Sequence, residues 1–177
     1  LRHGFIDCNE VDFLFIFNCE EKQDNHLVDK ITSSSNSRVV YRENEGYDFG
    51  AWSHGLQQVD TNGYDYFIFI NQSVRGPFLP NWHDEYQKSW FRIFTDMIDD
   101  TTKLAGASIN FCSGEAHVQS MITVTDRVGL QVGLDNGVFD LEYLKSFSPE
   151  PGFNHRRGLG HIVDRCEIGW SKAIIQS

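Results

Sequence analysis

The stretch YDYFIFINQSVRGPFLP, residues 64–80, carries the pattern that decides the fold class. Its centre, Tyr66 to Ile70, consists only of aromatic and β-branched residues, which is the composition of a β-strand. A strand that is apolar at every position is buried on both faces, as in a parallel sheet covered by helices. The strand ends at the polar triplet Asn71-Gln72-Ser73, and Gly76-Pro77 then predicts a turn.

Two more strands and two helices are predicted upstream of this strand. VDFLFIFN (11–18) is a second continuous apolar run, and RVVYR (38–42) is a shorter one. Residues 24–33 can form a short helix between them, and ENEGYDFGAWSHGLQQV (43–59) reads as a glycine turn that opens a helix. Because parallel strands need such crossovers, we predict an α/β fold, a mostly parallel twisted sheet with helices on both faces.

The second half of the chain continues this pattern with less regularity. Lys103 to Phe111 and Gln119 to Asp126 are predicted as two more strands of the sheet. RVGLQVGLDNGVF (127–139) is an amphipathic helix closed by its Asn-Gly pair. Residues 148–161 are rich in Gly, Pro and basic residues and suit either a surface loop or a ligand-facing lid, with the composition favouring the loop. A last helix is predicted over residues 164–177.

Composition and charge exclude several classes of protein. The 177 residues suffice for one domain with a sizeable core, so we expect a single domain over the whole chain. The formal net charge is −10 and the basic residues form no run, which argues against nucleic acid or an anionic membrane as the main partner. No segment reaches the ~18 apolar residues of a membrane span. The four cysteines lack CxxC spacing, which favours buried thiols over a zinc site. The cytoplasm and the secretory-pathway lumen both stay open as locations.

The expected fold directs attention to the loops that follow the strands. In open α/β sheets, ligands bind outside the carboxyl ends of the strands, where loops converge. In this sequence those loops are residues 18–20, 43–48, 71–76 and 112–117. The polar triplet that ends the strand at Ile70 therefore lies on the expected ligand-facing rim.

Five sequence blocks resemble one family in the same order. They are RENEGYDFGAW (42–52), YDYFIFINQSVRGPFLP (64–80), KLAGASIN (103–110), HVQSMITVTDRVGL (117–130) and CEIGWSKAI (166–174). In this order they resemble GT-A-type glycosyltransferases similar to the rhamnan-synthesis F proteins, over about residues 11–174. The resemblance implies a Rossmann-like GT-A fold, a nucleotide-sugar donor across the strand ends and a glycan hydroxyl as acceptor. It also implies that a first nucleotide-binding strand precedes residues 1–7, which would make this chain a fragment.

The resemblance raises a question about a metal ion. In such folds the strand at 66–70 normally ends in Asp-x-Asp, whose carboxylates hold Mn²⁺ or Mg²⁺. Asn71-Gln72-Ser73 stands there instead, so the metal ligands are unknown. Either the metal is lost, or Asp48 or Glu115 supplies charge, or Arg75 becomes the counter-ion of the diphosphate, which we favour. A capped turn also accounts for Asn71 and Ser73.

The donor side is predicted to include the glycine turn as well as Asn71, Ser73 and Arg75. The resembling family contacts its donor there, which assigns Asn44, Gly46 and Asp48 to the donor. Backbone amides at the start of the helix can face a phosphate, because a glycine permits close approach. The alternative for Asp48 is a favourable contact with the helix dipole.

The acceptor side is predicted from two short patterns. His117 and Gln119 alternate at the start of a strand, so both can line the cleft, although a lone histidine is often structural. Glu167, which matches a glutamate of the family, is the candidate base that takes the proton from the acceptor hydroxyl. It would open the last helix, where an interaction with the helix dipole is the alternative. In a retaining reaction Glu167 would orient the acceptor instead.

Two other functions stay open. A non-catalytic nucleotide- or sugar-binding domain derived from a glycosyltransferase would keep the scaffold without the metal motif. An unrelated nucleotide-binding α/β domain, such as a phosphohydrolase, should show a phosphate loop or an acidic nucleophile after a strand, and the sequence has neither. The expected function is therefore the transfer of a sugar from a nucleotide donor to a hydroxyl.

Overall fold

The stretch that ends at Asn71 forms strand β3 with the predicted bounds, Tyr66–Ile70. The computed structural model describes residues 8–19, 26–78, 89–111, 114–147 and 155–177, and the fold is stated for these ranges. The first elements are β1 (Phe13–Asn18), α1 (His26–Thr32), β2 (Ser37–Arg42), α2 (Tyr47–Leu56), β3, α4 (Arg92–Thr95), β4 (Leu104–Gly106) and β5 (Ile109–Asn110). The others are β6 (His117–Val118), β7 (Ile122–Asp126), α5 (Arg127–Asp135), α6 (Leu141–Lys145), α7 (His155–Ile162), a π helix (Val163–Ile168) and α8 (Gly169–Gln176).

The strands form three small sheets among the described residues, so the prediction of a mostly parallel Rossmann-like GT-A sheet is wrong. β1 and β2 are a parallel pair, as expected for a helical crossover through α1. The order in the central sheet is β3-β7-β4, and β7 runs antiparallel to both neighbours. The third sheet is the β5–β6 hairpin.

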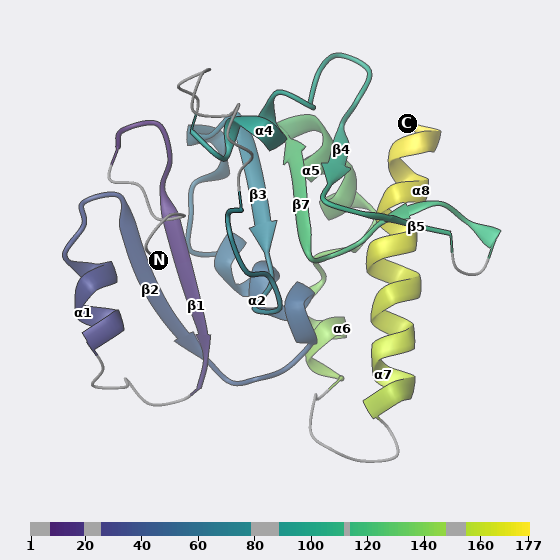
Figure 1. Ribbon diagram of the computed structural model, residues 1–177. Coiled ribbons are helices and arrows are strands. Elements are labelled where there is room, and N and C mark those ends of the chain that lie inside the picture. The colour runs from purple at the N-terminus through teal and green to yellow at the C-terminus, as the bar shows by residue number, and fades with distance from the viewer. Residues whose placement is uncertain (1–7, 20–25, 79–88, 112–113, 148–154) are drawn as a thin grey trace.

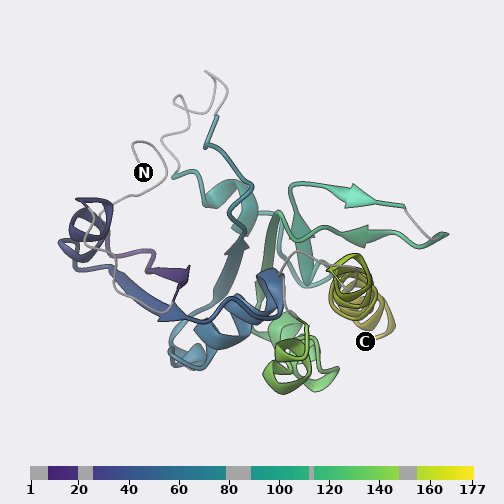
Figure 2. The same cartoon turned by 90° about the horizontal axis from the view of Figure 1, so that it is seen from below.

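The hairpin explains why the central sheet is antiparallel. A parallel neighbour of β4 would need a crossover, usually a helix, in the following residues. Instead, β5 and β6 pair as an antiparallel hairpin, and the chain returns directly beside β4 as β7. Figures 1 and 2 show this hairpin extending past the long C-terminal helix. The predicted strand 103–111 is divided into β4 and β5, and the predicted strand 119–126 begins only at Ile122, as β7.

The core lies between the central sheet and the helices on one of its faces. Figures 1 and 2 show α2 and α5 on the same side of β3 and β7. Trp52 from α2 and Phe69 from β3 pack with ring centroids 5.2 Å apart. Trp170 from α8 is 1% exposed and donates its indole N–H to the Gly129 carbonyl at 3.0 Å. This contact fixes α8 against α5.

The C-terminal helix is longer than predicted. α7, the π helix and α8 form one continuous helix over residues 155–176 (Figure 1). Residues 155–161, which we expected in a loop, are helical, and the rest of the segment 148–161 lies outside the described residues. The helix packs closely against Phe147 at Gly158, where a Cβ would lie 3.4 Å from the Phe147 side chain, an ordinary contact distance.

Candidate functional site

The loop before α2 is held in place by Arg42 at the end of β2. Its guanidinium donates to the Asn18 side-chain oxygen at 2.9 Å and to the Glu45 carbonyl at 2.6 Å. Gly46 follows with φ 70°, and a Cβ there would lie 2.9 Å from the Leu144 side chain. Only glycine adopts this conformation without strain and fits this space, so the start of α2 is fixed.

The Gly46 amide is not open to a phosphate, which corrects one expectation. It donates to the Phe147 carbonyl at 2.7 Å. Tyr47 also has a positive φ of 54°, which is uncommon for a non-glycine residue and concentrates at functional sites. These two residues place Asp48 in the first turn of α2.

Asp48 meets Asn71 at the carboxyl end of β3. The Asn71 amide donates to Asp48 Oδ2 at 3.0 Å, and Asn71 Oδ1 accepts from the Ser73 backbone N–H at 3.0 Å. Asn71 therefore caps its own turn, as the structural alternative predicted, and also binds Asp48, while its contact with a donor stays a prediction. No described residue donates to Asp48 Oδ1.

Ser120 links this pair to Glu167. Its hydroxyl donates to Asp48 Oδ2 at 3.3 Å, and its backbone N–H donates to Glu167 Oε1 at 3.0 Å. Two carboxylates that are 119 positions apart in the sequence are thus joined through one serine in the turn before β7. The structure brings Asp48, Asn71 and Glu167 to one place.

Glu167 lies inside the π helix, not at the start of a helix, so an interaction with an N-terminal helix dipole does not explain it. π-helical turns within α-helices are frequent at functional sites. The side chain of Glu167 is 10% exposed, and its Oε2 lies 3.7 Å from Nε2 of His117. The carboxylate is thus held between Ser120 on one side and His117 on the other.

His117 belongs to the interior side of the site. It is 3% exposed, and its Nδ1 lies 3.2 Å from the Glu115 carbonyl. The side-chain oxygen of Gln119 accepts from the Ser108 hydroxyl across the hairpin at 3.0 Å. No described hydrogen bond joins it to His117 or Glu167, and the expectation that both residues line one cleft stays a prediction.

The remaining predicted donor residues lie on exposed turns. Arg75 is exposed, and its guanidinium donates to the carbonyls of Gln72 and Val74 at 3.0 and 3.2 Å. Ser73 is exposed beside Asn71, and Asn44 is exposed two residues before Gly46. These three residues lie close in sequence to Gly46 or Asn71, but no described contact joins their side chains to Asp48 or Glu167.

The electrostatics of the site follow from two carboxylates that have no Lys or Arg partner among the described residues. Burial raises the pKa of the Asp48 carboxyl, hydrogen bonds from Asn71 and Ser120 lower it in part, and the charge of Glu167 raises it again. Within the described ranges, no Lys or Arg forms a hydrogen bond or ion pair with either carboxylate. The chemistry available here is therefore the acceptance of hydrogen bonds by carboxylate oxygens.

The triplet at the end of β3 does not fit a Mn²⁺ or Mg²⁺ centre. Hard cations take oxygen ligands, but Asn71 turns its NH₂ group to Asp48 and its oxygen to the backbone. Glu115, the other acid considered, is paired with Lys172 at 2.6 Å. Among the described residues, no three His, Cys, Asp or Glu side chains gather as a metal centre.

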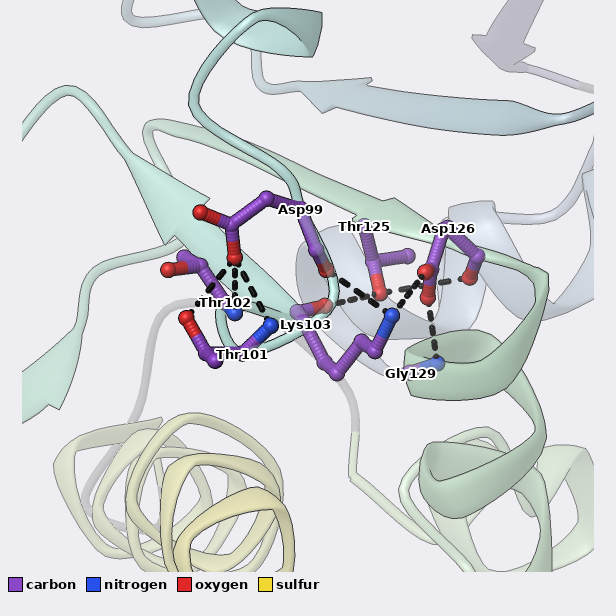
Figure 3. A network of polar contacts seen from close by, with 7 residues as sticks. All are labelled: Asp99, Thr101, Thr102, Lys103, Thr125, Asp126 and Gly129. Carbon is purple, nitrogen blue, oxygen red and sulfur yellow. Dashed lines mark hydrogen bonds and ion pairs between the residues drawn. The ribbon is translucent and has the colours of Figure 1, made fainter.

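A second polar network lies at the opposite end of the central sheet (Figure 3). Lys103 donates to Asp126 Oδ2 and to the Asp99 carbonyl, both at 2.9 Å. Asp126 also caps α5, because its Oδ1 accepts from the Gly129 N–H at 2.8 Å. Asp99 Oδ1 accepts from the amides of Thr101 and Thr102. Asp99, Lys103 and Asp126 line a surface pocket together with Arg127, so the acidic groups of this pocket have basic neighbours.

Sequence reasoning missed Ser120 and the π helix. Ser120 lies inside the block 117–130, but a serine in a turn has no distinguishing pattern. The sequence placed it inside the predicted strand 119–126, so its position in a turn was not expected. The π helix has no sequence signal that we can identify.

Comparison of this chain with family models, with curated proteins and with solved structures finds no match. Across the ranges that the structure describes, every helix is too short or too polar to cross a membrane.

Proposed function

We propose that this protein transfers a sugar from a nucleotide-sugar donor to a hydroxyl of a glycan acceptor. The observation that carries the proposal is the single network of Asp48, Asn71, Ser120 and Glu167 at the carboxyl end of β3. The proposal is also supported by the ordered sequence blocks that resemble glycosyltransferases. A pair of carboxylates with amide and hydroxyl neighbours suits a ligand rich in hydroxyl groups.

Glu167 is the proposed base. It takes the proton of the acceptor hydroxyl while the acceptor oxygen bonds to the anomeric carbon of the sugar. The bond from that carbon to the diphosphate oxygen breaks, and the nucleoside diphosphate leaves with the electron pair. Ser120 holds Glu167 Oε1, which fixes the carboxylate for this transfer.

Asp48 and Arg75 have the other proposed roles. Asp48 Oδ1 accepts a hydrogen bond from a sugar hydroxyl, because both donors in the structure use Oδ2. Arg75, exposed on the turn after Asn71, is the proposed counter-ion of the leaving diphosphate.

The first test is a thermal-shift panel of nucleoside diphosphates and their sugars. A ligand at ~100 times its Kd adds about 2.7 kcal/mol of stability, which raises Tm by several degrees. No stabilisation by any nucleotide or nucleotide sugar would contradict the proposal.

The second test uses Glu167→Gln. We expect unchanged donor binding and a fall in transfer of about 100-fold or more, because the base is lost. Glu142→Gln is the matched control, since Glu142 is 86% exposed on α6 and pairs only with Lys145. Undiminished transfer in Glu167→Gln would refute the role of the base. Donor binding without turnover in the unmodified protein would favour the non-catalytic binding domain.

A further inference from the structure

Ser120 is the residue that contacts both carboxylates of the site. The hydroxyl reaches Asp48 Oδ2 at 3.3 Å and the backbone N–H reaches Glu167 Oε1 at 3.0 Å. These are two different donors of one residue, directed at acids from α2 and from the π helix. The relative position of the two acids therefore depends on where the backbone of Ser120 lies.

That backbone is anchored on both sides. Before Ser120, the Gln119 N–H donates to the Ser108 carbonyl at 3.1 Å, and the Gln119 carbonyl accepts from the Thr123 hydroxyl at 3.1 Å. After it, the Met121 carbonyl accepts from the Asn71 N–H at 3.1 Å. The turn is thus tied to the hairpin, to β7 and to the end of β3. Ser120 has little freedom to move.

The contact leaves one oxygen of Asp48 for a ligand. Asn71 and Ser120 both donate to Oδ2, and no described residue donates to Oδ1. A carboxylate with one oxygen doubly bound has its orientation fixed, and the second oxygen can accept from a hydroxyl. Without the Ser120 hydroxyl, Asp48 would keep one donor and could rotate about its side chain.

We propose that Ser120 is a positioning residue that holds Asp48 and Glu167 in one fixed arrangement, so that Asp48 Oδ1 is presented to a hydroxyl group of the sugar substrate. This inference rests on the proposed function for the identity of the ligand. The geometry of the contact itself does not depend on it.

The decisive variant is Ser120→Ala. It removes the hydroxyl that Asp48 accepts from and keeps the backbone N–H that Glu167 accepts from. Ser120→Thr keeps both donors and is the conservative variant. Ser171→Ala is the matched control, because Ser171 is buried beside the β6 strand, its hydroxyl accepts from the Val118 N–H, and no described hydrogen bond joins it to either acid.

The first measurement needs no ligand. The ¹³C carboxyl signal of Asp48 is followed against pH in the whole chain, where the facing titratable groups are Glu167 and, behind it, His117. A hydrogen bond to the charged form favours that form, so its loss in Ser120→Ala should move the Asp48 titration to higher pH. Ser120→Thr should restore it and Ser171→Ala should leave it unchanged. An Asp48 titration that Ser120→Ala does not move, or that Ser171→Ala moves equally, would overturn the proposal.

The second measurement uses the nucleotide sugar that stabilises the protein most in the thermal-shift panel. We expect Ser120→Ala to lower kcat/KM by about tenfold, the equivalent of one lost hydrogen bond to a charged group, with rescue in Ser120→Thr. If the titration moves but kcat/KM does not, the contact is structural and the positioning role is refuted. If no nucleotide sugar binds any variant, the proposed function fails, while the Asp48 titration still decides whether Ser120 controls that carboxyl.

Discussion

The two ends of the central sheet both carry a network of acidic side chains, and the networks differ in charge balance. At the carboxyl end of β3, Asp48 and Glu167 meet through Ser120, and no described Lys or Arg pairs with them. At the other end, Lys103 lies between Asp99 and Asp126 (Figure 3). The same residue types thus occur in a balanced and an unbalanced arrangement on one sheet.

The difference separates a network that holds the fold from one that suits a ligand. The balanced network caps α5 through Asp126 and closes a turn at Asp99, so these contacts stabilise local elements of the fold. The unbalanced network buries like charges close together, which costs free energy unless a ligand or a proton compensates. The lack of charge balance, more than the number of acidic residues, therefore supports our proposal that the end with Asp48 and Glu167 binds the ligand.

The largest effect on stability is expected from Gly129→Ala at the balanced end. A Cβ on Gly129 would lie 2.2 Å from the Thr125 hydroxyl and 2.3 Å from the Lys103 carbonyl. Backbone and core must shift to admit it, so we expect a loss of about 2–3 kcal/mol in the free energy of unfolding, measured with urea. Gly160→Ala is the control, because nothing lies within 4 Å of its Cβ, and it should leave stability unchanged or slightly higher. Equal urea midpoints for Gly129→Ala and the unmodified protein would show that this end does not hold the fold.

A smaller effect of the opposite sign is expected from Asp48→Asn at the unbalanced end. Burial raises the folded-state pKa of Asp48 above its ordinary 3.8, so its contribution to stability is present at low pH and is lost as pH rises through the folded pKa. The amide keeps an acceptor for Asn71 and removes the charge. We expect Asp48→Asn to gain less than about 1 kcal/mol at pH 7 and to match the unmodified protein below pH 3.8, while sugar transfer falls. The prediction is contradicted if the difference in stability between the variant and the unmodified protein is less favourable to the variant at pH 7 than at pH 3.

The smallest effect is expected from Asp99→Asn. The backbone amides of Thr101 and Thr102 lower the pKa of Asp99 to about 2, so its contribution is present above 3.8 and is lost as pH falls towards 2. The variant lacks this titration, and its urea midpoint should therefore fall less steeply between pH 4 and pH 2. If the urea midpoints of the two proteins fall by the same amount between pH 4 and pH 2, the lowered pKa of Asp99 is ruled out. Together with Asp48→Asn, this measurement compares two acids whose pKa values move in opposite directions.

Local pattern predicted the individual elements of the first half well. β3 has its predicted bounds, and β1 and β2 form the parallel pair that a crossover through α1 requires. The direction of β7 could not be predicted, because a strand buried on both faces has the same apolar composition in either direction. α7 was taken for a loop because its two glycines, Gly158 and Gly160, lower helix propensity, which tertiary packing overrides.

The candidate site was predicted through positions, and its contacts were not. Asp48 and Asn71 were expected together because both follow strand ends, and the structure brings them within 3.0 Å. Gln119 was assigned to the same face as His117 by strand alternation; β6 ends at Val118 and Gln119 bonds to Ser108 across the hairpin, so its place in the cleft stays a prediction. Ser120 reaches both acids because of the turn in which it lies. The amino-acid composition of a turn does not predict the direction of its side chains.

The π helix has a consequence for how this chain can change in length. The Gly169 N–H bonds to the Asp164 carbonyl five residues back, so this segment contains one residue more than an α-helical turn would hold. Six π-helical residues turn through about the same angle as five α-helical ones, so deleting one residue there and restoring ordinary winding would leave α7 and α8 close to their present phase. Trp170 would then stay in the core. A single-codon deletion is therefore better absorbed in this segment than inside α7 or α8, where it would rotate everything beyond it by about 100°.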